Sequence, residues 1–233
     1  MFYKNKASVG IIIVSVASVA ILFAVIRVLK LAHKSSLYRC ISYFFTKKDQ
    51  YILKERRIYY EYTDLEHIEH RKEFDVYTRN DSFELFTDRY VFSGETKCKL
   101  NPSPSDLKIV DEHIDHGWNF YSIMLNSPVP KHSVVHVGMK MDTIEDKNHT
   151  AKPYLSTGIY EATQSLKMTI KFGEGLTPSN PKLKIYKDYT DRTPVEERAL
   201  QFDASKRIIE YIESYPMYHY KYLVSWSFES GKQ

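Results

Sequence analysis

Cysteine and glycine are scarce in this sequence of 233 residues, which holds two Cys and eight Gly. Two cysteines exclude a disulfide-rich secreted scaffold, and without a Cys-x-x-Cys pair there is no zinc ribbon or thioredoxin-type site. Neither Gly-x-Gly-x-x-Gly nor Gly-x-x-x-x-Gly-Lys occurs, so the glycine-rich loops that let a backbone approach phosphate closely are missing. Gly-x-Ser-x-Gly and His-Glu-x-x-His are also absent. These absences favour a protein that is not an enzyme and has no cofactor.

The charge is unevenly distributed along the chain, although the formal net charge is only +4. Residues 1–50 contain eight Lys or Arg and one Asp, whereas residues 51–233 contain 25 basic and 28 acidic residues. The basic excess therefore belongs to the N-terminal fifth. Because nucleic-acid binding needs a basic surface on the folded domain, we expect no nucleic-acid partner.

A run of twenty uncharged residues, Ala7–Ile26, is long enough to cross the hydrocarbon core of a bilayer as a helix of about 30 Å. It predicts a transmembrane helix over residues 7–29 and a single-pass membrane protein. A cleaved signal peptide is the rival interpretation, but its apolar core would be shorter and followed by a small-x-small cleavage site. Here Arg27, Lys30 and Lys34 follow instead.

Basic residues flank this run unequally, with Lys4 and Lys6 before it and six Lys or Arg within residues 27–48. The more basic side usually stays in the cytoplasm, so the C-terminal domain is expected there. Residues 30–52 mix bases with aromatic and aliphatic side chains. They form either an amphipathic stretch on anionic lipid or an ordinary linker helix.

After residue 50 the hydrophobic pattern alternates with a period of two, which is typical of half-buried β-strands. The clearest examples are Leu166–Phe172 and Tyr218–Phe228, where apolar or aromatic residues alternate with polar ones. Extended segments are expected at 57–62, 72–77, 83–86, 88–93, 107–111, 118–125, 132–141, 154–161, 164–172, 182–187, 206–213 and 218–228.

Turn-forming residues separate these segments, for example Asn80-Asp81, Asn101–Pro104 and Gly173–Gly175. About ten short strands separated by such turn-forming residues predict an all-β domain over residues 53–229, with the fold of an antiparallel β-sandwich or a barrel. The one helical signal is Thr193–Arg198, with Thr193 as the N-cap and Pro194 as the first helical residue.

Two similar segments, Glu66–His70 and Glu112–His116, both read Glu-His-Ile-acid-His. Histidine and carboxylate are suitable ligands for zinc and related metals. The two His of each segment are three residues apart, so they would share a face on a helix but point to opposite faces on a strand. The flanking pattern is strand and turn, which favours polar segments without a metal, and whether the two segments converge stays open.

Other His, Cys and Trp side chains could take part in catalysis, metal binding or ligand binding, but the sequence pattern identifies no second residue that would complete such a site. His132 and His136 would face the same side of a strand about 13 Å apart, too far to share a metal. Cys98 lies between two lysines, which would lower its pKa, but no base is identified for it. Trp118 and Trp226 are expected in strands, either in the core or lining a ligand cleft.

The C-terminal half carries a pattern of Pro153-Tyr154-Leu155, then Leu166–Phe172, then a last strand ending in Tyr222–Phe228. Over residues 105–228 this resembles the β-sandwich accessory domains of bacterial signalling and defence proteins. The resemblance implies a bacterial source and a non-enzymatic role, and it transfers no site residues.

The combined interpretation is a membrane-anchored, non-enzymatic binding or sensing module whose β-sandwich lies at the cytosolic face of the inner membrane. Its expected partners are the lipid bilayer and another protein or a small ligand. One alternative is a bacterial defence effector that oligomerises on ligand binding, since Gly10, Ser15 and Ala17 would let a second helix approach. The other is a metal-dependent enzyme that uses the two Glu-His-Ile-acid-His segments.

Overall fold

The structure, a computed structural model, describes residues 50–91, 99–144 and 153–228. Every regular element in these ranges is a β-strand, so the expected all-β fold class is confirmed. The strands belong to one compact unit, Thr46–Gln233. In chain order they are β1 (Tyr51–Tyr62), β2 (His67–Thr78), β3 (Phe83–Tyr90), β4 (Lys99–Ser103), β5 (Lys108–Asp115), β6 (Trp118–Val129), β7 (Val134–Ile144), β8 (Tyr154–Gly158), β9 (Ser165–Phe172), β10 (Pro178–Tyr186), β11 (Glu196–Ala199), β12 (Phe202–Asp203), β13 (Ile208–Ser214) and β14 (Lys221–Phe228).

The predicted transmembrane helix over residues 7–29 and most of the basic segment over residues 30–52 lie outside the described residues. No helix long and apolar enough to cross a membrane occurs within 50–91, 99–144 and 153–228.

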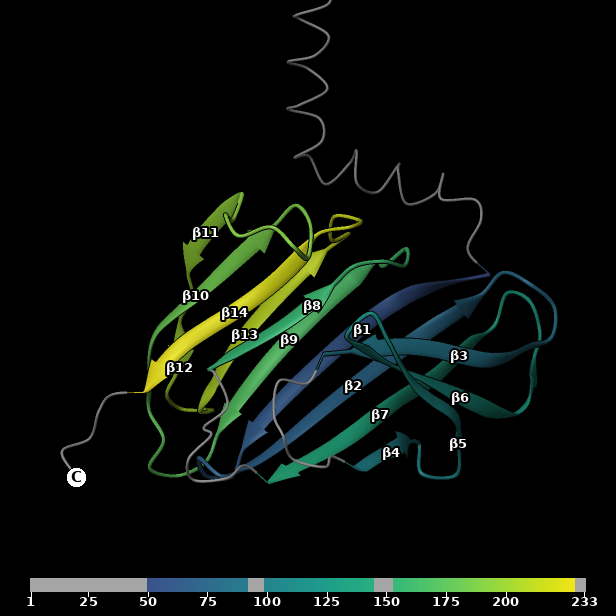
Figure 1. The fold of residues 1–233 in the computed structure, drawn as a ribbon, viewed down its shortest axis with the longest axis horizontal. Helices are drawn as coiled ribbons and strands as arrows, with labels where there is room; N and C mark the ends of the chain where they lie inside the picture. Colours follow the sequence, from purple (N-terminus) through teal and green to yellow (C-terminus); the bar gives the residue numbers. More distant parts are fainter. Residues whose placement is uncertain (1–49, 92–98, 145–152, 229–233) are drawn as a thin grey trace, which may run out of the picture. The chain divides into compact units, whose positions relative to one another are not determined.

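The strands form three sheets, drawn together in Figure 1. The largest has seven strands in the order β12-β13-β9-β1-β2-β7-β4, and the two smaller ones have the orders β11-β10-β14-β8 and β3-β6-β5. The ladders between neighbouring strands are antiparallel, except that β1 and β9 run parallel.

One face of the seven-stranded sheet packs against both smaller sheets, and this arrangement makes two separate cores. The first core joins β9 and β13 to β10 and β14, and it is centred on Met168, Phe172, Tyr222 and Trp226. The second joins β2 and β7 to β3 and β6. The predicted alternation of β9 is confirmed, because Leu166, Met168, Ile170 and Phe172 are each at most 1% exposed.

The opposite face of the seven-stranded sheet is covered by charged pairs between neighbouring strands. Lys171 donates to Glu61 at 2.6 Å across β9 and β1, and Lys167 contacts Glu210 at 2.6 Å across β9 and β13. Such cross-strand pairs on a solvated face stabilise a sheet by a few tenths of a kcal/mol to about 1 kcal/mol each. This is the polar side of the predicted alternation.

The expected helix at Thr193–Arg198 is wrong, because Glu196–Ala199 forms strand β11 beside β10. The Val195 N–H donates to the Ile185 carbonyl at 2.8 Å, and Lys182 forms an ion pair with Glu197 at 3.0 Å. Pairing with a neighbouring strand therefore outweighs the local capping signal. The strands expected at 132–141 and 218–228 begin later, at Val134 and Lys221.

Candidate functional site

The candidate site is a small pocket between the two smaller sheets, which we call the seam pocket. Strands β3 and β8 are edge strands of their sheets, and both contribute to the pocket wall above β1 and β2 of the large sheet. Its cavity volume is about 40 Å³, room for about three water molecules. The two free sheet edges thus leave a space that is lined by side chains.

Strands β1 and β2 are each twelve residues long and run through both cores, which explains how polar residues come to lie beneath the pocket. On β2, Ile68 belongs to the first core and Phe74 to the second. Between them the same face of the strand carries His70 and Lys72. On β1, Arg56 is paired with Phe74 and lies between the same two cores.

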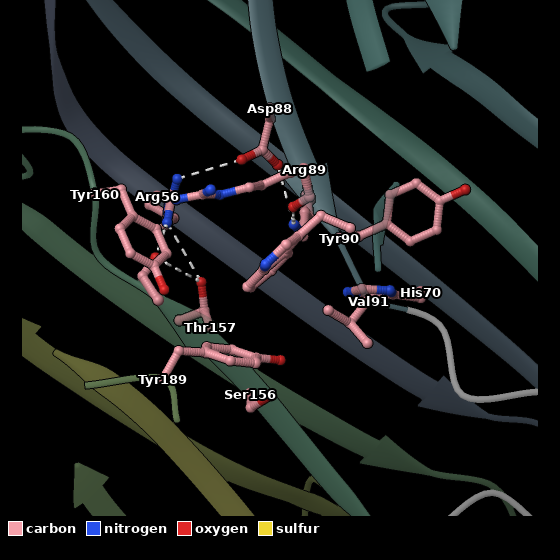
Figure 2. A pocket seen from close by; sticks show the side chains of 13 residues that line it. Arg56, His70, Asp88, Arg89, Tyr90, Val91, Ser156, Thr157, Tyr160 and Tyr189 are labelled. Atoms are coloured by element: carbon pink, nitrogen blue, oxygen red, sulfur yellow. Dashed lines mark hydrogen bonds and ion pairs between the residues drawn. The ribbon is translucent and has the colours of Figure 1, made fainter. Parts of the chain in front are cut away.

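Arg56 and Asp88 line the pocket and are the centre of a buried ion cluster (Figure 2). The Arg56 guanidinium, 4% exposed, lies 3.4 Å from Asp88 and 2.8 Å from Glu161, and it donates to the Gly158 carbonyl at 2.6 Å. The link to Gly158 satisfies a backbone group at the edge of β8. Arg56 therefore joins β1 to both smaller sheets.

Lys72 binds the other side of the same carboxylate. Its Nζ donates to Asp88 Oδ2 at 3.0 Å and to the Arg89 carbonyl at 2.6 Å, and the Tyr121 hydroxyl also donates to Asp88 Oδ2 at 3.0 Å. Asp88 thus accepts from two cations and a phenol. Such a network stabilises a fold only while all members are present, because a buried charge left alone is costly.

The pKa values of the cluster follow from burial and from these contacts. Burial alone would raise the pKa of Asp88, but Lys72 and Arg56 together lower it. Burial lowers the pKa of Lys72, and the adjacent Arg56 contributes in the same direction. Burial raises the pKa of Glu161 although Arg56 opposes this shift. Arg56 and Lys72 are matched in number by Asp88 and Glu161, so the cluster itself adds no net charge to the pocket.

Arg89 is the cation in excess. Its guanidinium carbon lies 3.9 Å from the ring centre of Tyr160, 4.8 Å from that of Trp118 and 5.8 Å from that of Phe120. The Trp118 ring in turn contacts Tyr189, 4.5 Å between centroids. No carboxylate of the described residues lies within ion-pair distance of Arg89. Aromatic faces thus hold this guanidinium at the pocket without neutralising it.

Two buried nitrogen atoms among the pocket residues have no hydrogen-bond partner in the described part of the chain. They are His70 Nε2 and Arg56 Nε. The His70 ring packs edge-on against Tyr60, and burial together with Lys72 lowers its pKa to about 3, so the imidazole is neutral at physiological pH. A buried polar atom without a partner costs about 1–3 kcal/mol.

The arrangement is suited to binding an anion. Arg89 supplies a guanidinium that has no carboxylate within ion-pair distance among the described residues, although it also interacts with the Glu161 carboxylate at longer range, lowering the pKa of that group. The pocket hydroxyls are used elsewhere, since Thr157 contacts Arg56 and Ser156 is hydrogen-bonded to Tyr189. In the described pocket no Ser or Thr hydroxyl is hydrogen-bonded to a His or carboxylate, the pairing that activates such nucleophiles.

The two Glu-His-Ile-acid-His segments are not brought together. His67 and His70 lie on β2 of the large sheet, whereas His113 lies on β5 of a small sheet and stacks on Phe120. Within the described ranges there is no group of three or more His, Cys, Asp or Glu side chains that could hold a metal. His67 and His70 both lie on β2 and face opposite sides of it, whereas His116 lies in the turn that follows β5.

The other singled-out residues have ordinary roles where the structure describes them. Trp226 is buried in the first core, and Trp118 is the one tryptophan that lines the pocket. His136 lies on β7 and pairs with Asp75 at 2.9 Å, whereas His132 lies in the turn before that strand and contacts Tyr77. Cys98 is outside the described residues.

Sequence reasoning missed the site residues, although a signal for them is present. On the inward faces of β2 and β3 the apolar alternation is interrupted, by His70 and Lys72 in one and by Asp88 in the other. Together with Arg56 on β1, these are charged or polar residues at core positions of three strands, which indicates either a buried network or a site.

Comparison with known proteins gives a weak structural likeness. No protein-family model matches the chain, and no curated protein matches it. Solved structures that are similar include a candidate protease from Parabacteroides distasonis, with a TM-score of 0.43 and 10% identity over 79% of this chain and 37% of that one. An M1 zinc metallopeptidase from Deinococcus radiodurans has a TM-score of 0.40 and 7% identity over 76% of this chain and 42% of that one.

The chain spans less than half the length of these structures. At such TM-scores and identities the likeness carries no argument about activity. The resemblance to accessory domains of signalling and defence proteins stays a prediction.

Proposed function

We propose that this protein is a membrane-anchored, non-enzymatic binding module that holds a small anionic ligand in the seam pocket. The observation that carries the proposal is Arg89, a guanidinium among three aromatic rings with no carboxylate within ion-pair distance in the described part of the chain. The domain would present this pocket at the cytosolic face of the membrane.

The Arg89 guanidinium requires hydrogen-bond acceptors for its N–H groups. A guanidinium has five N–H donors in one plane, and stacking on Tyr160 occupies a face of that plane while leaving the donors at its edge. Carboxylates and phosphates bind such an edge through two parallel hydrogen bonds. Because the neighbouring cluster balances its own charges, an anion is the ligand that complements Arg89.

Binding without turnover is supported by the pocket hydroxyls, which contact Arg56 and Tyr189 rather than a base. Membrane anchoring is supported by the uncharged run Ala7–Ile26 and by the basic residues that follow it. The basic segment would lie near anionic lipid headgroups, which adds lipid to the partners of the protein.

Arg89→Gln is expected to weaken anion binding at least 30-fold, because the substitution removes the charge and the bidentate edge together. The measurement is isothermal titration calorimetry of full-length protein in detergent with acetate, sulfate and phosphate. Arg89→Lys keeps the charge without the planar fork and is expected to bind with intermediate affinity.

Arg198→Gln is the matched control, since Arg198 also lies over an aromatic ring, that of Tyr211 at 5.2 Å, but is not in the pocket. Its anion affinity should equal that of the wild type. The binding proposal is wrong if none of the three anions binds the wild type, or if Arg89→Gln and Arg198→Gln behave alike.

The membrane anchor has its own test. The full-length protein is expected to stay in the membrane fraction after an alkaline carbonate wash, and Val16→Lys with Val19→Lys should release it, because each charge near a helix centre costs about 2.5–3.5 kcal/mol on insertion. The matched control is Val16→Leu with Val19→Leu. Wild-type protein in the wash supernatant, or retention of the lysine variant, would contradict the anchor.

A further inference from the structure

We propose that Glu161 regulates the seam pocket: its carboxylate is an internal counter-charge to Arg89, and the loss of that charge on protonation tightens the binding of an anion. This inference rests on the proposed function and adds the regulation of the same site. Anion binding is then coupled to the uptake of a proton by Glu161.

Glu161 lies beside the pocket. It follows Tyr160, whose ring stacks on the Arg89 guanidinium at 3.9 Å. Its own carboxylate lies 2.8 Å from Arg56, which lines the pocket, and it also interacts with Arg89 at longer range. The charge of Glu161 therefore acts on the space into which an anion would bind.

Glu161 is the acid of the ion cluster that solvent reaches. Its side chain is 25% exposed, whereas that of Asp88 is 4% exposed and is held between Arg56 and Lys72. A carboxyl group that water reaches can exchange its proton without opening the fold. Glu161 can therefore titrate while Asp88 stays bound to its two cations.

The loss of the Glu161 charge does not leave Arg56 alone. The Arg56 guanidinium still lies 3.4 Å from Asp88. It also still donates to the Gly158 carbonyl at 2.6 Å and to the Thr157 hydroxyl at 3.4 Å. Because a buried cation without a partner is what makes a broken network costly, protonation of Glu161 changes the charge of the site without unfolding it.

The charge of the site depends on Glu161. The cations Arg56, Lys72 and Arg89 exceed the acids Asp88 and Glu161 by one, and they exceed them by two once Glu161 is neutral. Charges near a protein surface interact several times more strongly than charges in bulk water. The additional net positive charge therefore favours an anion in the pocket.

The pKa of Glu161 is raised above its ordinary value. Burial raises it most and Asp88 adds to the rise, while Arg56, Arg89 and Lys72 oppose the rise without cancelling it. An anion bound at Arg89 is a further negative charge nearby, which raises this pKa again. By linkage, the protein with protonated Glu161 then binds the anion more tightly than the protein with charged Glu161.

Several other groups of the pocket keep their charge state between about pH 5 and pH 8. The pKa of Asp88 is lowered by its two cations, and that of His70 is about 3. Burial raises the pKa of Tyr160 and of Tyr189, so both phenols stay neutral. None of these four groups gives a change of charge in this range.

Three groups near the pocket can gain a proton besides Glu161. Burial lowers the pKa of Lys72, the His219 ring packs edge-on against Tyr160 with centroids 6.1 Å apart, and Asp188 interacts with Tyr160. Each of them would also add positive charge on acidification. Because Glu161→Gln retains all three, this variant isolates the contribution of Glu161.

The test is calorimetric titration of full-length protein in detergent with sulfate, which keeps both of its charges between pH 5 and pH 8. At pH 8, Glu161→Gln is expected to bind sulfate at least about fivefold more tightly than the wild type. From pH 8 to pH 5 the wild-type affinity should rise at least about threefold, and that of Glu161→Gln should stay within about twofold. Titrations near pH 5 in buffers of different ionisation enthalpy should show proton uptake by the wild type.

Glu210→Gln is the matched control, since it breaks an ion pair of 2.6 Å with Lys167 on the opposite face of the large sheet. Its sulfate affinity should equal that of the wild type at both pH values.

Equal sulfate affinities of Glu161→Gln and the wild type at pH 8, or binding without proton uptake, would overturn this inference and leave the proposed function in place. A pH dependence that persists in Glu161→Gln would assign it to Lys72, His219 or Asp188 and would also overturn the inference. Wild-type protein that binds no sulfate at either pH overturns it as well. If acetate and phosphate also fail to bind, the proposed function is overturned with it.

Discussion

Asp88→Asn is expected to lower the free energy of unfolding by about 3–5 kcal/mol, because it leaves Arg56 and Lys72 buried side by side without their shared counter-ion. The Asp88 side chain is 4% exposed and bridges both cations at 3.0–3.4 Å. In thermal unfolding of full-length protein in detergent, followed by near-ultraviolet circular dichroism, the midpoint should fall by roughly 10 °C.

The matched control is Glu61→Gln, which breaks an ion pair of similar length with Lys171 on the exposed face of the large sheet. Its cost should not exceed about 1 kcal/mol, because water screens that pair. Equal effects of the two substitutions would show that the seam cluster is not a buried network.

Asp88 should also affect how the free energy of unfolding depends on pH. Its pKa is lowered in the folded protein, since Lys72 and Arg56 outweigh the effect of burial. The stabilisation is therefore complete above the ordinary carboxyl pKa of about 4 and is lost as the pH falls through the lower folded value. Wild-type protein should lose stability on acidification below about pH 4, and Asp88→Asn should lose less.

Phe172→Ala should cost about 3–5 kcal/mol, because it empties the centre of the first core. The Phe172 ring is 1% exposed, stacks on Tyr62 with centroids 5.6 Å apart, and meets the edges of Trp226 and Phe202. The same thermal unfolding experiment measures the loss. Because Phe172 and these ring contacts lie in the first core, sulfate affinity below the unfolding transition should stay within about twofold of wild type.

Ile212→Ala is the control for this experiment, since Ile212 lies on β13 of the same sheet but is 55% exposed. Its effect should be within about 0.5 kcal/mol, as for other surface substitutions. A cost below about 1 kcal/mol for Phe172→Ala would contradict the assignment of this ring to a packed core.

The longer strands could be predicted because burial of one face requires apolar residues at every second position of the sequence. In β9 every second residue from Leu166 to Phe172 is buried, and in β14 Tyr222, Val224 and Trp226 are buried in the same way. The short strands could not be predicted. β11 and β12 have four and two residues, and β4 contains Pro102, so their pairing depends on partners far along the chain.

The seam pocket could not be derived from local pattern, because its residues come from β1, β2, β3, β6 and β8 and from Val91, Tyr160 and Tyr189, which lie outside the strands. What brings Arg56 to Asp88 is the packing of two small sheets side by side on one large sheet, and their order is not encoded within any strand. The only sign of the pocket within single strands is that His70, Lys72 and Asp88 occupy inward-facing positions, where apolar residues are usual. Polar residues at such positions are a sharper indication of a site than the two Glu-His-Ile-acid-His segments were.

The most direct test of the proposed function is a crystal structure of the full-length protein grown with arsenate, an oxyanion that is located by its anomalous scattering. The proposal predicts an anomalous peak in the seam pocket, with arsenate oxygens within hydrogen-bond distance of the Arg89 guanidinium. A pocket that holds only water, with arsenate absent or bound elsewhere on the protein, would contradict it.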